Sequence, residues 1–346
     1  MDIKPFKIGS RFVGPGFPAY IIAEIGYNFN TIEEGVASID AAVECGVDAV
    51  KFQTFRAETI TSKLNDFPDE AGGGSQYDEF KRYELSEDDH KKFFDYANKL
   101  GLDVFSTPSY YDDAVLLMKI GVPVFKTGAD DLTNLPFLEY LAKKGIPMIV
   151  STGMGTMSEV ADAVGTILSA GNDQLVLLHT VSNYPIKDIS EVNLKAMVTM
   201  RNAFGVMTGY SDHTTTLSIS MAAMALGMAV YERHFTIDKN LPAPDCALSA
   251  DPREMKLIVS GIREVEKALG DGYKRPASSE KLMRKDARKS VIVARDLESG
   301  HKISKEDLII KRPAWGIHPS RINDIQGMKL KKSLKKDEPI TWEHFK

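Results

Sequence analysis

The chain has 346 residues, of which 43% are hydrophobic and 26% are charged, and its formal net charge is -5. This length suits one barrel-sized domain with a small appendage, or two to three average domains. The balanced charge, with no basic run interleaved with aromatic residues, argues against nucleic acid as a partner.

The start of the chain, residues 1–20, lacks the charged region and apolar stretch of a signal peptide, and no segment approaches the length of a membrane span. We therefore expect a cytoplasmic protein that does not bind a membrane. The only cysteines are Cys45 and Cys246, too few for a disulfide framework or a cysteine metal site.

Apolar runs rich in β-branched residues alternate with segments of helical periodicity from Ala19 to about Gly270. This pattern predicts eight strands, each followed by a helix, at residues 20–25, 48–55, 103–107, 122–128, 148–152, 175–181, 206–212 and 229–236. The most regular helices are expected at residues 31–45, 86–100 and 251–269. Such alternation implies parallel strands, and eight units at this length predict an α/β fold, the (β/α)8 TIM barrel.

A long polar segment, Arg56 to Tyr83, separates the second predicted strand from its helix and contains Gly72-Gly73-Gly74. On a barrel it would lie over the catalytic face. Because long loops in compact domains are often functional, we expect a lid, with plain surface disorder as the alternative.

The pattern changes after Gly270. Residues 271–285 are polar and irregular and predict a linker, and residues 286–346 predict a small β-rich domain. Its short strands are expected at residues 290–294, 308–311 and 339–342. The domain has few candidate core residues, so we expect it to lean on another part of the protein for stability.

The carboxyl ends of the predicted strands are polar, and in barrels of this type the reactive groups lie at those ends. In chain order the residues there are Glu24, Asn28, Lys51, Gln53, Thr107, Lys126, Ser151, Ser182, Tyr184, Ser211, His213, Glu232 and His234. Two lysines, several hydroxyls and the amides of Ser151-Thr152-Gly153 predict a site for a small anion carrying phosphate or carboxylate. A single lysine could instead reach solvent, but two inward lysines are costly to bury without an anion.

Three of these strand-end residues suggest the chemistry. His213 or His234 alone could be a satisfied polar residue, but together they favour a divalent metal, which would polarise a carbonyl. Glu24 could act as an acid, a base or a metal partner, or could form a salt bridge with Lys51. Glu24 could have a catalytic role and also form the salt bridge, since a paired lysine would keep the carboxylate ionised until substrate enters.

These residues, in this order, resemble the sialic acid (N-acetylneuraminate) synthase family over nearly the whole chain. The motifs that carry the resemblance are Ala23-Glu24-Ile25-Gly26-Tyr27-Asn28, Lys51-Phe52-Gln53-Thr54, Ser106-Thr107-Pro108, Ser151-Thr152-Gly153-Met154, Ser211-Asp212-His213-Thr214 and Glu232-Arg233-His234-Phe235-Thr236. The tail, with Arg288-Lys289-Ser290 and Lys311-Arg312-Pro313, resembles the SAF domain of these synthases, a β-clip fold like type III antifreeze protein. The resemblance implies a domain-swapped homodimer, in which the SAF domain of one subunit reaches over the active site of the other.

The resemblance also implies an activity and a role for each site residue. The enzyme would condense phosphoenolpyruvate and water with an open-chain N-acetylmannosamine-type sugar, giving a nine-carbon 2-keto acid and phosphate. His213 and His234 would hold Mn2+ or Mg2+, and Glu24 would manage the proton and water steps. Phosphoenolpyruvate would be bound by Lys51, Thr107, Lys126, Ser151, Ser182 and Ser211. The sugar would be contacted by Gln53, Tyr184, Glu232, Asp245 and, from the partner subunit, Arg312.

The segment Lys126-Thr127-Gly128-Ala129-Asp130-Asp131 departs from the family pattern of a lysine, two small or apolar residues, serine and glutamate. Ala129 removes a hydroxyl expected near phosphoenolpyruvate. Asp131 keeps a substrate-binding carboxylate but shortens it, and Trp315 stands where small residues are common. The identity of the sugar is therefore open among N-acetylmannosamine, its 6-phosphate and the diacetamido dideoxy sugars that lead to legionaminic or pseudaminic acid.

Two functions of other classes also fit parts of the sequence. A Schiff-base aldolase or lyase would use Lys51 or Lys126 as its nucleophile and would need no metal. A sugar-binding protein that has lost catalysis would explain Ala129 and Asp131, although Glu24, both lysines and both histidines are retained.

Overall fold

The computed structural model describes residues 3–67 and 73–345, so Gly72 of the predicted glycine run lies outside the described residues. The chain divides after Gly270 into two compact units. Each unit has a hydrophobic core of its own. Within the described ranges, no helix is both long and apolar enough to cross a bilayer.

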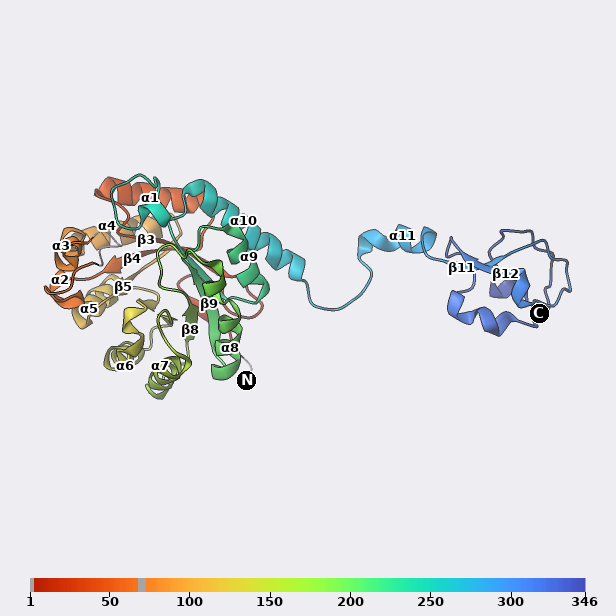
Figure 1. Ribbon diagram of the computed structural model, residues 1–346, viewed down its shortest axis with the longest axis horizontal. Helices are drawn as coiled ribbons and strands as arrows, with labels where there is room; N and C mark the ends of the chain where they lie inside the picture. Colours follow the sequence, from red (N-terminus) through yellow and green to blue (C-terminus); the bar gives the residue numbers. More distant parts are fainter. Residues whose placement is uncertain (1–2, 68–72, 346) are drawn as a thin grey trace. The chain divides into compact units, whose positions relative to one another are not determined.

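The first unit is built around eight parallel strands (Figure 1), and its core contains residues of these strands and of the helices around them. These are β3 (Tyr20–Gly26), β4 (Ala49–Thr54), β5 (Asp103–Pro108), β6 (Phe125–Thr127), β7 (Met148–Ser151), β8 (Leu175–His179), β9 (Met207–Asp212) and β10 (Val230–His234). Their order in the sheet is β5-β4-β3-β10-β9-β8-β7-β6, so the first barrel strand pairs with the last. β5 and β6 are neighbours where the sheet closes, but no ladder joins them in the described part of the chain. The predicted eight strands and TIM-barrel architecture are confirmed.

Helices cover the outside of this barrel, so the strands are buried on both faces (Figure 1). They are α1 (Ile32–Cys45), α4 (Glu87–Lys99), α5 (Tyr111–Ile120), α6 (Leu135–Ala142), α7 (Met157–Ser169), α8 (Lys195–Phe204), α9 (Leu217–Ala225) and α10 (Pro252–Leu269). Two further short helices, α2 (Ala57–Ile60) and α3 (Gln76–Arg82), lie in the segment between β4 and α4. The starts of α1, α4 and α10 agree with prediction because the side chains of Thr31, Ser86 and Asp251 accept hydrogen bonds from the first-turn amides.

A short antiparallel hairpin, β1 (Phe6–Ile8) and β2 (Arg11–Val13), was not predicted. It covers the amino-terminal end of the barrel, where Ser10 donates two hydrogen bonds to Asp103, the first residue of β5. Ile8 and Val13 are completely buried in the main core. The hairpin therefore closes the end of the barrel opposite the predicted site.

The predicted lid, residues 56–83, contains α2 and α3 rather than an irregular loop. Its ends pack in a small separate core, in which Phe55 and Tyr83 contact Ala243 and Cys246 in the segment after β10. Tyr83 also donates a hydrogen bond of 3.1 Å to the carbonyl of Pro242. The alternative prediction of surface disorder is therefore wrong for residues 56–67 and 73–83.

The second unit contains one two-stranded antiparallel sheet, β11 (Ser290–Val293) with β12 (Leu308–Lys311), within its described residues. The third predicted strand, 339–342, is wrong: Pro339 makes an isolated bridge to Ile292, and a 3-10 turn begins at Trp342. A short helix, α11 (Lys281–Asp286), occupies part of the predicted linker.

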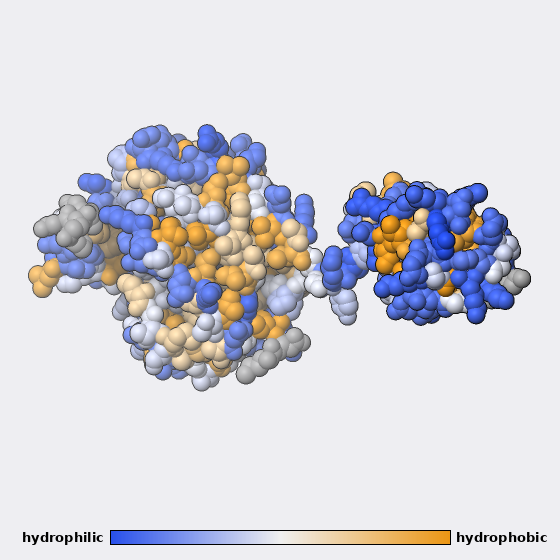
Figure 2. All heavy atoms as spheres, turned by 45° about the vertical axis from the view of Figure 1, so that its right-hand side comes forward, coloured by the Kyte–Doolittle hydropathy of each residue, from blue (hydrophilic) through white to orange (hydrophobic). Residues whose placement is uncertain are grey.

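The second unit has more of a core than its sequence suggested. Its buried apolar residues come from β11 and from widely separated turns, and they include Val291, Val293, Leu297, Ile303, Ile317, Ile325, Leu330, Leu334, Ile340 and Phe345. The expected shortage of core residues is therefore wrong. Hydrophobic residues also lie on its surface, where Figure 2 shows orange atoms among blue ones. Separately, the large side chains of Ile309, Trp315 and Trp342 are exposed.

Candidate active site

The register of the barrel places the predicted site residues at the same level on neighbouring strands. Glu24 of β3 lies opposite Lys51 of β4 on one side and His234 of β10 on the other. In the same way, Gln53 lies opposite Thr107, and Glu232 lies opposite Ser211. Because the strands are parallel, all these side chains gather at the carboxyl end of the barrel.

Glu24 and Lys51 form a buried ion pair, with 2.5 Å between Glu24 Oε2 and Lys51 Nζ. Lys51 Nζ also donates a hydrogen bond of 3.0 Å to the hydroxyl of Thr107. Gln53 Nε2 donates a 3.0 Å bond to the other carboxylate oxygen of Glu24. The structure thus joins four predicted site residues and confirms the predicted salt bridge.

Burial raises the pKa of Glu24 to about 7, against the opposing effect of Lys51 and with a further upward push from Glu232. Burial and Lys51 act on this pKa in opposite directions, so the ionised state of the carboxylate before substrate enters stays a prediction. At neutral pH both protonation states of Glu24 are therefore populated, which suits a group that takes and gives protons.

A second lysine–glutamate pair lies beside the first. Lys126 Nζ is 3.5 Å from Glu232 Oε1 and donates a 2.9 Å bond to the carbonyl of Thr127. Ser211 donates to the same Glu232 oxygen at 3.2 Å. Although burial opposes ionisation of Glu232, Lys126 and Lys51 lower its pKa. Each inward lysine is thus paired with a glutamate, and each ammonium group could pair with a bound anion instead.

His213 and His234 face each other, with ring centroids 5.5 Å apart. Tyr184 packs on His213 at a centroid distance of 4.2 Å, and Asp245 Oδ2 lies 3.7 Å from His234 Nδ1. Burial, helped by His234, lowers the pKa of His213 to about 4, and burial with Lys51 lowers that of His234 to about 3. Both rings are therefore neutral at pH 7, the form in which histidine binds a metal.

The hydrogen bonds of these rings fit a divalent metal. His213 Nδ1 lies 2.8 Å from the carbonyl of Val181, which can only accept, so Nδ1 carries the proton and Nε2 keeps its lone pair. His234 Nδ1 is buried and makes no hydrogen bond. Among the described residues, no three His, Cys, Asp or Glu side chains are grouped for metal binding. Substrate or water would have to supply further ligands.

The remaining predicted residues lie around this centre. Ser182 is close to the turn after β7, because a Cβ added to Gly153 would meet Ser182 Oγ at 2.3 Å and the Ala129 Cβ at 3.0 Å. Ser182 Oγ is buried without a hydrogen-bond partner, so a donor or acceptor from a ligand would satisfy it. Ser151 is buried at the end of β7.

Asp131 is buried in the turn after β6, where it accepts a 2.9 Å bond from Asn134. Burial raises its pKa to about 6. Arg312 belongs to the second unit and is exposed. Its contact with the sugar remains a prediction.

The sequence did not single out a buried network around Asp212 and Arg233. Their side chains lie 3.1 Å apart, and the hydroxyl of Tyr231 donates to Asp212 at 2.9 Å. These residues alternate along β9 and β10 with the site residues Ser211, Glu232 and His234. The sequence did contain a signal for this network: Asp212 and Arg233 are charged residues within two predicted buried strands, where charged residues are rare.

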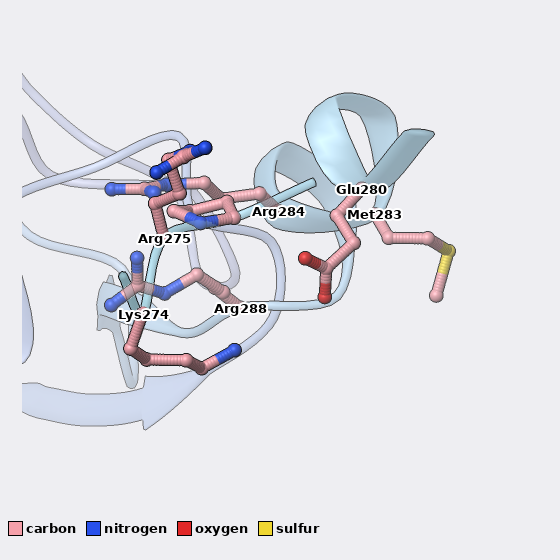
Figure 3. A pocket seen from close by; sticks show the side chains of 7 residues that line it. Lys274, Arg275, Glu280, Met283, Arg284 and Arg288 are labelled. Atoms are coloured by element: carbon pink, nitrogen blue, oxygen red, sulfur yellow. The ribbon is translucent and has the colours of Figure 1, made fainter. Parts of the chain in front are cut away.

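The second unit has a pocket of about 350 Å3, which is far more basic than the barrel site. Figure 3 shows Lys274, Arg275, Arg284 and Arg288 around it, together with Glu280. Arg275 already pairs with Asp271 at 2.7 Å. None of the predicted site residues lines this pocket.

The chain matches two family models, the NeuB family over residues 38–274 and the SAF domain over residues 288–346. It is 41% identical to the N,N'-diacetyllegionaminic acid synthase of Legionella pneumophila, over 96% of each chain. It is 34% identical to the N-acetylneuraminate-9-phosphate synthase of Mus musculus, over 95% of this chain and 93% of that one.

A crystal structure of the N-acetylneuraminic acid (sialic acid) synthetase from Leptospira borgpetersenii, in complex with citrate, superposes with a TM-score of 0.74. It is 29% identical and covers 81% of this chain and 95% of its own. With the family models and the two relatives, this likeness confirms the resemblance read from the ordered motifs: the chain belongs to the NeuB family of sialic-acid-type synthases and ends in a SAF domain.

Proposed function

We propose that this protein condenses phosphoenolpyruvate and water with an open-chain N-acylated mannosamine-type sugar, giving a nine-carbon 2-keto acid and phosphate. The observation that carries the proposal is the pairing of two buried lysines with two glutamates, beside two neutral histidines, at the carboxyl end of one barrel. Family membership supports the same class of reaction.

Phosphoenolpyruvate would bind where the two lysines meet the hydroxyl groups. Its phosphate and carboxylate would draw Lys51 and Lys126 away from Glu24 and Glu232, because a multiply charged anion competes well for a buried ammonium group. The hydroxyls that would complete the cradle are those of Thr107, Ser151, Ser182 and Ser211. Ser182 Oγ, which is buried without a partner, would gain one.

The sugar would lie beside the histidines, in contact with Gln53, Tyr184, Glu232, Asp245 and Asp131. A Mn2+ or Mg2+ ion held by His213 and His234 would polarise the aldehyde oxygen. These residues would orient the aldehyde carbon toward the phosphoenolpyruvate methylene, and a carbon–carbon bond forms between the two. Orientation of this kind accounts for a large part of the rate of such bimolecular steps.

Glu24 would act on the water that completes the reaction. Carbon–carbon bond formation leaves positive charge at C2 of the former phosphoenolpyruvate, and water adds there. The ionised Glu24 carboxylate would accept a proton from that water. The bond between C2 and the phosphate oxygen then breaks as the C2 hydroxyl loses its proton to the departing phosphate, and the 2-keto group remains. The proton held by Glu24 would pass to the former aldehyde oxygen, which becomes a hydroxyl, and Glu24 returns to its ionised form.

A diacetamido dideoxy sugar is the second candidate substrate, with legionaminic acid or its isomer pseudaminic acid as the product. The supporting observation is that the relative named N,N'-diacetyllegionaminic acid synthase is 41% identical, whereas the N-acetylneuraminate-9-phosphate synthase is 34% identical. The chemistry at the two histidines and at Glu24 would be the same for both classes of sugar.

Phosphate release tests the function and the choice of sugar together. Purified protein with phosphoenolpyruvate and Mn2+ is expected to release phosphate with at least one of four sugars: N-acetylmannosamine, its 6-phosphate and the two diacetamido dideoxy isomers. Loss of activity in chelator and its return with Mn2+ would support the metal. Full activity in chelator, with a pyruvoyl adduct trapped by borohydride, would favour the Schiff-base alternative, and no release with any sugar would favour a binding protein.

We also propose that the SAF domain acts on the active site of a second subunit, with Arg312 at the N-acyl group of the sugar. Replacement of Arg312 by alanine is expected to raise KM for the sugar about tenfold, because a charged hydrogen bond is lost, while KM for phosphoenolpyruvate stays unchanged. Steady-state kinetics with each substrate varied would measure this. Arg321→Ala, at another exposed arginine of the same unit, is the control; equal sugar kinetics in both variants would contradict the assignment.

A further inference from the structure

A buried carboxylate lies directly behind the two histidines. Asp212 of β9 is opposite Arg233 of β10 in the ladder, and the next residues along the two strands are His213 and His234. Arg233 Nη1 lies 3.1 Å from Asp212 Oδ2, although Nη1 makes no aligned hydrogen bond. Both side chains are almost completely buried, so their interaction is little screened by solvent.

The carboxylate of Asp212 joins the end of β9 and the residues after it to β10. Tyr231 donates its hydroxyl to Asp212 Oδ2 at 2.9 Å, and the backbone amide of Thr214 donates to Oδ1 at 2.8 Å. Tyr210 adds a longer contact of 3.4 Å. Since residues 212 and 214 flank His213, the bond to Thr214 fixes the main chain that carries the His213 ring.

The position of His234 depends on the same strand end. Its Nδ1 makes no hydrogen bond, so no side chain of the described residues fixes the ring through that atom. The main chain of β10 is held on one side by the ladder to β3, where His234 lies opposite Glu24, and the amide of Ala250 donates to the His234 carbonyl at 2.8 Å. On the other side it is held to β9 by the ladder and by the pair of Arg233 with Asp212. A change in this pair would therefore alter the distance between the two rings.

We propose that Asp212, with Tyr231 and Arg233, is a positioning unit that sets the spacing of His213 and His234 for a divalent cation. These residues would touch neither metal nor substrate and would act through the main chain of the two histidines. The inference rests on the metal site of the proposed function. Loss of a group that orients metal ligands typically weakens metal binding ten- to a hundredfold.

Two tyrosine-to-phenylalanine variants of the full chain provide a matched test. Tyr231→Phe removes the hydroxyl that bonds to Asp212. Tyr20→Phe removes an equally buried hydroxyl that donates to Asp103 Oδ2 at 3.0 Å, at the amino-terminal end of β3, far from the histidines. Titration of Mn2+ alone, followed by the electron paramagnetic resonance signal of the free ion, would give the dissociation constant without any substrate.

Tyr231→Phe is expected to bind Mn2+ about tenfold more weakly than the wild type, and Tyr20→Phe within about twofold of it. Equal affinity in all three proteins, or an equal loss in both variants, would overturn the positioning role while leaving the metal site intact. Failure of the wild type to bind Mn2+ would instead remove the proposed metal site, and this inference with it.

Variants of Arg233 give a second measurement. Arg233→Met leaves Asp212 buried without its cation and is expected to weaken Mn2+ binding by more than Tyr231→Phe does. Arg233→Lys keeps the charge and is expected to recover most of the affinity. If Arg233→Lys binds Mn2+ as weakly as Arg233→Met, the ion pair does not position the histidines. Should Arg233→Met fail to fold, the two tyrosine variants still decide the question.

Discussion

Replacement of Glu24 by glutamine is expected to lower kcat for phosphate release by roughly a hundred- to ten-thousand-fold, the usual contribution of a positioned acid–base group. Glutamine keeps the shape of the side chain and can still accept the hydrogen bond from Gln53. It cannot take a proton from water, and it leaves Lys51 without its buried counter-charge. A continuous phosphate-release assay at saturating substrates would measure the loss.

The same residue predicts how the wild-type rate depends on pH. Burial raises the pKa of Glu24 to about 7, so its ionised form increases as the pH rises through 7. Since the ionised form accepts the proton, kcat/KM is expected to fall about tenfold for each pH unit below this value and to level off above it. Glu24→Gln should lack this limb of the profile.

Glu266→Gln is the matched control. Glu266, on α10, accepts hydrogen bonds from the amide of Ala19 and from Arg263 at 3.0 Å, so the variant also removes one partner of an ion pair. Its activity per folded molecule should equal that of the wild type. If the two variants lose activity to the same degree, Glu24 contributes only to stability.

Replacement of His234 by alanine is expected to reduce turnover by roughly a thousandfold or more, with only a small change in Tm. The loss follows because a metal that polarises a carbonyl supplies several kcal/mol of transition-state stabilisation, and about 1.4 kcal/mol corresponds to a tenfold change in rate. The small change in Tm follows because His234 Nδ1 has no hydrogen bond to lose. Thermal unfolding and phosphate release, measured on the same preparation, would test the expected Tm and the expected loss of turnover.

His90→Ala provides the opposite pattern. Both ring nitrogens of the buried His90 are occupied, Nδ1 by the carbonyl of Ser86 at 2.8 Å and Nε2 by the hydroxyl of Thr54 at 2.7 Å. Its loss leaves buried polar groups unpaired, at a cost of about 1–3 kcal/mol, so Tm should fall by several degrees while activity per folded molecule remains. A larger fall in Tm for His234→Ala than for His90→Ala would make His234 a structural residue.

The barrel could be predicted from the sequence because its signals are local. Each strand is a short apolar run, and residues such as Ser86 and Asp251 mark helix starts in the sequence as clearly as in the structure. The hairpin of β1 and β2 escaped prediction because three-residue strands are too short for any periodicity to show. The core of the second unit escaped for a related reason, since its apolar residues are scattered among turns.

The sequence predicted which residues form the candidate site. Apart from the salt bridge of Glu24 with Lys51, it did not predict which of them contact one another. Strand ends and ordered motifs identified Glu24, Lys51, Lys126 and Glu232, but periodicity alone does not say which carboxylate neutralises which lysine. The raised pKa of Glu24 likewise depends on burial, which is a property of the assembled barrel. The Asp212 network was missed because it faces away from the site, on the side of each strand where apolar residues are expected.

The junction between β5 and β6, where no ladder is found among the described residues, lies at the site itself. Thr107 is the penultimate residue of one of these strands, and Lys126 lies in the other. A ligand that contacts both residues would link the two edges of the sheet at the place where the backbone does not. Binding of such a ligand would then stabilise the closed barrel and make local opening at this junction less frequent.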